Sequence, residues 1–220
     1  MIMKAETLSE QLFLLAMNKR GGINGSQFHA QLALVMAGLL DLQEAGMIVL
    51  DERSVRLKKG ELSGRFIFLQ PLLDVLKGIS KPTLKKVADV YCGTFTDKEL
   101  KKYLQGIRKE MQQKGLLNVT KENSYLGEKS VYTANDTEVQ LILKNLELNL
   151  EKAIFDEKGI HLWILLEQGK LLNKYYPKDK IKSFHKRWDQ CQNQSLLKGF
   201  GVMKKEIEGM FWTLMIAASI

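Results

Sequence analysis

Residues 96–133 read TDKELKKYLQGIRKEMQQKGLLNVTKENSYLGEKSVYT and join a basic amphipathic helix directly to a short β-hairpin. Apolar residues recur at helical spacing from Leu100 to Met111, and a glycine stop follows at Lys114-Gly115. The arms of the predicted hairpin are Leu116–Thr120 and Val131–Thr133. This stretch predicts a mainly α-helical protein from which one hairpin projects.

Helix signals surround this unit on both sides. Capping boxes, which satisfy backbone N–H groups at a helix start, occur at Thr7-Leu8-Ser9-Glu10, Thr96-Asp97-Lys98-Glu99 and Asn135-Asp136-Thr137-Glu138. Apolar spacing predicts further helices over residues 8–18, 27–45, 82–91, 136–153, 160–168, 178–189 and 207–218, and one that begins at Pro71. A second small hairpin is expected at Ile48–Leu50 and Ser54–Leu57. Arg65–Leu69 fits either a strand or the lead-in to the helix at Pro71, and we expect it to be short and partly extended. The predicted fold is a single-domain helical bundle over residues 1–220 with one or two hairpins.

The composition is that of an ordinary globular protein. Hydrophobic residues make up 45% and charged residues 26%, and three prolines leave little room for flexible linkers. Cys92 and Cys191 follow no disulfide or metal-binding spacing, which favours a reducing compartment. The first residues lack an apolar core of signal length, and the longest apolar run, Met210–Ile220, is too short to cross a bilayer. We therefore expect a cytoplasmic protein whose membrane contact is peripheral, on the cytosolic face.

The charge balance points to an acidic partner. Lys and Arg number 33 against 25 Asp and Glu, which gives a net charge of +8. The excess concentrates in residues 98–114, with six basic and two acidic groups, and in residues 178–205, with eight and two. Each segment is either a binding surface for anions or a solvated helix face.

Signals for catalysis are weak. His29, His161 and His185 each lack a second ligand three or four residues away, so we predict no metal site and a surface or packing role for each. No nucleophile elbow or phosphate loop occurs, and the glycine-rich residues 21–26 lack the lysine of such a loop. That segment is expected to be a turn, although it leads into a helix N-terminus at Gln27 that favours phosphate. The sequence predicts a protein that is not an enzyme and uses no cofactor.

The basic helix and the hairpin tip together favour binding to an anionic bilayer. Lys101, Lys102 and Arg108 gain from the negative surface potential, at about 1 kcal/mol each. Tyr125 and Leu126 at the tip can enter the interfacial zone without carrying charge. Alternatively, these two residues fold back onto the core or form a subunit contact that makes a homo-oligomer through the hairpin.

A winged-helix nucleic-acid binder is the rival hypothesis. It would place residues 97–114 in a major groove and use the hairpin as its wing. Against it, the tip at Tyr125-Leu126 is apolar, whereas a DNA-binding wing presents Lys or Arg. A third alternative is an adaptor for short cytosolic tails of membrane proteins, which is compatible with lipid binding.

The chain also resembles the Golgi phosphoprotein 3 family over almost its whole length. The resemblance rests on the order and spacing of apolar segments: residues 7–15, 38–42, 45–51, 72–76, 107–111, 114–117 and 210–218. It implies a helical bundle with the hairpin at Leu116–Thr133 laid on the membrane, and a peripheral adaptor that binds phosphatidylinositol 4-phosphate. The start of the first helix near Leu8 indicates a minimal member of the family, from a cell without a Golgi.

The resemblance further implies where a headgroup would bind. In the family, an aromatic residue before the second helix, an arginine on that helix and two arginines three apart on the basic helix form the pocket. In this chain the positions of the two paired arginines are occupied by Lys101, which keeps the charge, and by Leu104, which cannot bind phosphate. The other arginine falls on Val35, and the aromatic residue is matched loosely by Phe28. Anionic surface binding through Lys101, Lys102 and Arg108 is therefore expected, with weaker selectivity for the headgroup.

Overall fold

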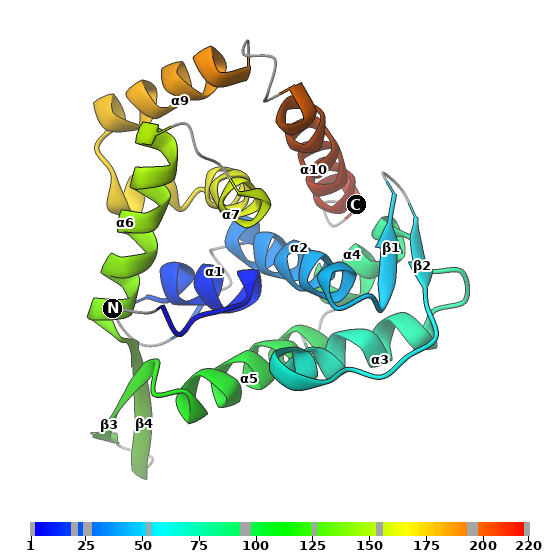
Figure 1. Ribbon diagram of the computed structural model, residues 1–220. Helices are drawn as coiled ribbons and strands as arrows, with labels where there is room; N and C mark the ends of the chain where they lie inside the picture. Colours follow the sequence, from blue (N-terminus) through cyan, green and yellow to red (C-terminus); the bar gives the residue numbers. More distant parts are fainter. Residues whose placement is uncertain are drawn as a thin grey trace.

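Helices dominate the protein, and two small hairpins lie at its periphery (Figure 1). The computed structural model describes residues 3–18, 22–23, 28–51, 54–92, 98–124, 127–152, 156–192 and 198–217. The elements are α1 (Leu8–Ala16), α2 (Phe28–Glu44), β1 (Ile48–Leu50), β2 (Val55–Leu57), the 3₁₀ helix η2 (Gly64–Leu69), α3 (Gln70–Gly78), α4 (Leu84–Cys92), α5 (Lys98–Gln113), β3 (Leu117–Ser124), β4 (Gly127–Ala134), α6 (Asp136–Lys152), α7 (Glu157–Gln168), α8 (Leu172–Tyr175), α9 (Lys178–Gln192) and α10 (Lys198–Ala217). The predicted mainly α fold with projecting hairpin is confirmed.

Helix α2 forms the centre of the core. Its residues from Leu32 to Leu42 are all buried, because the helix is apolar on every side. Helices α1, α4, α7 and α10 pack around it, and α7 is buried in the same way from Ile160 to Leu166. The buried side chains of these helices form one continuous cluster.

Glycines end two helices where the sequence predicts it. Gly46 after α2 has φ of 73° and Gly115 after α5 has φ of 67°, a left-handed conformation that favours glycine at a helix end. Each stop leads into an antiparallel hairpin. Strand β1 pairs with β2, and Leu117 to Ser124 of β3 pair with Ala134 to Gly127 of β4.

Three local predictions need correction. Residues Arg65–Leu69 are not extended but lie within the 3₁₀ helix η2, which runs straight into α3. Glu138 does not close a capping box with Asn135: the side chain of Asn135 accepts from the backbone of Thr137 and Glu138, but the Glu138 carboxylate turns elsewhere. Helix α10 begins at Lys198, well before residue 207. The capping box at residues 96–99 lies partly outside the described residues.

Candidate functional site

Helix α5 is held in place by a buried tyrosine. Its inner face, which comprises Leu100, Tyr103, Ile107 and Met111, is buried against the core. The hydroxyl of Tyr103 donates to the carbonyl of Leu34 at 3.0 Å and lies 3.0 Å from the hydroxyl of Ser9. These bonds join α5 to α2 and α1, so the orientation of the polar faces of α5 is fixed.

The basic side chains of α5 lie on two different flanks. Lys101 and Arg108 are seven residues apart, about two helical turns, so they lie on one flank. Lys102 is rotated by about 100° from Lys101 and lies with Glu99, its ion-pair partner at 2.8 Å, beside helix α3. The structure therefore does not bring the predicted site residue Lys102 to the flank of the other two.

The flank with Lys101 and Arg108 leads to the hairpin. The guanidinium of Arg108 lies 5.1 Å from the ring centre of Tyr132 on β4. Tyr132 pairs across the hairpin with Val119, whose exposed fraction of 43% is large for an apolar residue. Lys121 is exposed and lies two residues further along the same face of β3.

We call these residues together the α5–hairpin surface, and the contact of Arg108 with Tyr132 joins its two parts. It consists of Lys101, Leu104, Arg108, Val119, Lys121 and Tyr132. Figure 1 shows that the hairpin extends from the end of α5 away from the helical core. The predicted tip residues Tyr125 and Leu126 lie outside the described residues, and their insertion into a membrane stays a prediction.

Three of the four positions that the family resemblance assigns to a headgroup pocket are apolar, and these three are buried or half-buried. Val35 is fully buried within α2, and Leu104 is half-buried against the core. Phe28, the first residue of α2, is also half-buried, and its ring centre lies 6.1 Å from that of His29. Burial, together with the charge of Lys170, lowers the pKa of His29, so this imidazole is neutral at pH 7. Lys101 is the one of the four transferred positions that offers a charge.

The base of the hairpin is tied to the N-terminal segment by two charged groups. The ammonium of Lys114 lies 2.7 Å from a carboxylate oxygen of Glu10, which is fully buried, and 3.4 Å from Glu110. Burial disfavours the charge of Lys114, but the hydrogen bond and charge of Glu10 outweigh that cost and raise its pKa. On the other side, Glu138 accepts from the backbone N–H groups of Lys4 at 2.6 Å and Ala5 at 2.7 Å.

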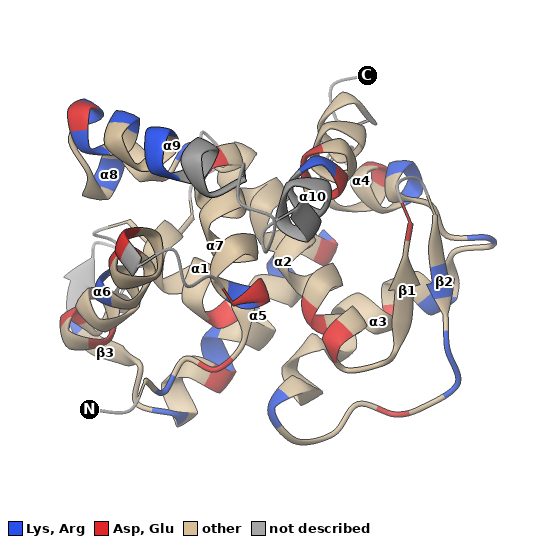
Figure 2. Cartoon of the chain, turned by 45° about the horizontal axis from the view of Figure 1, so that its top comes forward, with Lys and Arg blue, Asp and Glu red and all other residues tan. Residues whose placement is uncertain are grey.

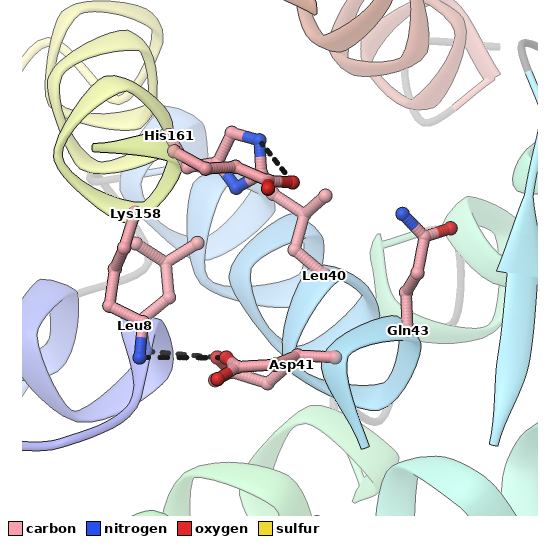
Figure 3. A pocket seen from close by; sticks show the side chains of 8 residues that line it. Leu8, Leu40, Asp41, Gln43, Lys158 and His161 are labelled. Carbon is pink, nitrogen blue, oxygen red and sulfur yellow. Dashed lines mark hydrogen bonds and ion pairs between the residues drawn. The ribbon is translucent and has the colours of Figure 1, made fainter. Parts of the chain in front are cut away.

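A cavity of about 350 Å³ lies between α1, α2 and α7, at a place that the sequence analysis did not single out (Figure 3). Asp41 accepts from the backbone N–H groups of Leu8 at 2.9 Å and Ser9 at 2.8 Å, so its carboxylate holds the first turn of α1. Burial raises the pKa of Asp41 to about 6 despite these bonds. Burial also lowers the pKa of His161, on the wall of the same cavity, to about 4.

The ionisable groups of this cavity have structural partners. Lys158 donates to the carbonyl of Glu6 at 2.7 Å and lies 3.5 Å from the carboxylate of Glu44. His161 is uncharged at pH 7 and lies 3.9 Å from Glu157. Across the described ranges, no group of three potential ligands could hold a metal ion, and no helix has the length and apolar character needed to span a bilayer.

Comparison with protein families places most of the chain within one family model. The family model described as Golgi phosphoprotein 3 (GPP34) matches residues 8–200. No curated protein matches the chain. The matched range includes α5, both strands of the hairpin and Glu10, the ion-pair partner of Lys114.

Proposed function

The chain belongs to the Golgi phosphoprotein 3 family, and on that premise we propose that it is a peripheral membrane protein whose α5–hairpin surface binds anionic phospholipid headgroups. The family consists of non-enzymatic adaptors that bind phosphatidylinositol 4-phosphate and associate peripherally with the Golgi membrane. The finer proposal for this chain concerns the residues that do the binding.

One observation carries the proposal: cationic and exposed apolar side chains share the α5–hairpin surface. Lys101 and Arg108 supply charge, which gains about 1 kcal/mol for each basic group near a negative leaflet. Val119 supplies exposed apolar area on the hairpin face next to Tyr132. The cation–π contact of Arg108 with Tyr132 holds the two parts together.

Lipid selectivity is proposed to follow charge more than headgroup identity. Val35 and Leu104 occupy two positions at which the family has arginine, and they are buried and half-buried. At these two positions the chain therefore lacks the guanidinium groups that recognise a phosphate through two parallel hydrogen bonds. Lys101 attracts phosphate as a point charge instead. Vesicles with phosphatidylserine or with phosphatidylinositol 4-phosphate should therefore bind the protein similarly when their surface charge is matched.

Vesicle flotation tests the proposal. The variant Lys101→Glu with Lys121→Glu removes two attractions and adds two repulsions, so binding should weaken by at least about 25-fold. The control, Lys58→Glu with Lys59→Glu, changes the net charge equally at two exposed residues after β2. Equal binding by the two variants would refute the assignment, and binding of duplex DNA in preference to vesicles would favour the winged-helix alternative.

A further inference from the structure

Helix α9 carries the second basic segment of the chain and attaches to the core by an aromatic contact. Phe184 is buried, with its ring 5.6 Å from that of Trp163 on α7 and 5.4 Å from that of Tyr176. Two inward-facing basic side chains on this helix lie next to acidic groups. Lys180 lies 2.9 Å from Glu147 of α6, and His185 lies 3.5 Å from Glu167 of α7.

The outer side of α9 carries cations that the fold does not use. Lys178, Lys182 and Lys186 recur every four residues and form a ridge, with Arg187 on its shoulder, and all four side chains are exposed. None of the ion pairs between described residues involves these four side chains, and Asp179 is an exposed acidic residue next to Lys178. We call these four residues the α9 ridge. In Figure 2 the blue bands of Lys and Arg recur along α9 at the edge of the molecule.

Repulsion among the cations of the ridge lowers the stability of helix α9. Like charges four residues apart on a helix repel each other and destabilise it. Among the exposed large apolar side chains of the described residues, none lies on α9, in contrast to Val119 on the hairpin. Helix α9 also lies at the edge of the molecule, where an extended partner surface can reach it (Figure 1). A flat, negatively charged surface fits these properties.

The α9 ridge and the hairpin lie at opposite ends of helix α6. The hairpin ends directly before Asp136, the first residue of α6, whereas the contact with α9 is made by Glu147, eleven residues later. At 1.5 Å per residue these two points are about 16 Å apart. Figure 1 shows the hairpin extending from this end away from α9. A bilayer at the hairpin is therefore beyond the roughly 8 Å over which charges interact in physiological salt.

We infer that the α9 ridge binds a second anionic bilayer, so that one molecule bridges two membranes; this inference rests on the proposed function of the α5–hairpin surface. Each basic group near an anionic surface strengthens binding roughly fivefold. Since the ridge offers charge without an apolar anchor, its contact is more sensitive to salt than that of the hairpin. Bridging is thus lost at a salt concentration at which the protein still floats with vesicles.

The experiment measures vesicle clustering by dynamic light scattering and vesicle binding by flotation, with vesicles containing phosphatidylserine. The variant Lys182→Glu with Lys186→Glu should float as the wild type does but cluster vesicles at least about 25-fold more slowly. The control is Lys58→Glu with Lys59→Glu, which has the same net charge and should behave as the wild type in both assays. Thermal melting of each variant establishes that the helix still folds.

The outcomes separate the inference from the proposed function. Wild type that floats without clustering vesicles, or a ridge variant that clusters them at the wild-type rate, overturns the bridging inference and leaves the α5–hairpin surface untouched. Wild type that does not float overturns the proposed function. A ridge variant that loses binding to duplex DNA in a gel shift while it still clusters vesicles assigns the ridge to nucleic acid and also overturns the inference.

Discussion

The ion pair at the base of the hairpin gives a quantitative prediction for Lys114→Met. Removal of one partner of a buried ion pair costs about 3–5 kcal/mol, because the other charge is left without compensation. Here Lys114 is 22% exposed, and the second carboxylate oxygen of Glu10 still accepts from the backbone of Glu6 at 2.9 Å and Thr7 at 3.0 Å. We therefore expect a loss of about 2–3 kcal/mol in the free energy of unfolding, which lowers the melting temperature by about 5–10 °C.

Urea unfolding followed by two optical probes measures this loss, and Lys109→Met is the matched control because Lys109 is exposed on the same helix. The control should change stability by less than about 0.5 kcal/mol. The double variant Glu10→Gln with Lys114→Met should be more stable than Lys114→Met alone, since the buried charge is then gone. Equal stability of Lys114→Met and Lys109→Met would refute the structural role that we assign to this ion pair.

Further predictions concern the cavity, the core and the hairpin. Because burial raises the pKa of Asp41 from 3.8 to about 6, its contribution to stability is greatest below about pH 4 and is lost as the pH rises through 6. The unfolding free energy of the wild type relative to Asp41→Asn should therefore fall by roughly 2 kcal/mol from pH 4 to 7 in urea titrations, and parallel pH profiles would contradict this. Gly38→Ala should lower stability by about 1–3 kcal/mol because the new methyl group meets the hydroxyl of Tyr103, whereas Gly209→Ala, with open space around it, should raise stability by up to about 1 kcal/mol in thermal melts. Val119→Ser should weaken flotation by severalfold at an unchanged melting temperature, and unchanged flotation would exclude an apolar contribution from this residue.

Local signals in the sequence predicted most helix boundaries. The Thr7 box caps α1 as expected, with Thr7 accepting from Glu10 at 3.2 Å and Glu10 accepting from Thr7 at 3.0 Å. The glycines after α2 and α5 end their helices because both positions need a left-handed backbone. Such signals act over three or four residues, so they can be read without knowledge of the fold.

The failures share a different cause, which is competition from distant parts of the chain. Glu138 has the spacing of a capping box but binds the backbone of Lys4 and Ala5, 134 and 133 residues away. In the sequence, Asp41 is a single polar residue within an apolar helix. Its role is visible only in the fold, where two backbone N–H groups of α1 donate to it. The division of Lys101 and Lys102 between two flanks was predictable in part, since helical spacing rotates them apart, but the position of α3 beside Lys102 was not.

Three side chains from other parts of the chain hold the start of α1. Asp41 of α2 accepts from the backbone of the first turn, and Lys114, just after α5, pairs with Glu10. Glu138 of α6 accepts from the backbone of the segment that precedes α1. Strand β3 begins close to Lys114, and strand β4 ends close to Glu138, so both ends of the hairpin lie next to one of these contacts. A tilt of the hairpin would therefore disturb the centre of the core as well. We therefore expect the molecule to bind a bilayer as a rigid body. The tilt of the helical bundle relative to the membrane is then set by the orientation of the hairpin base, without a hinge between the two.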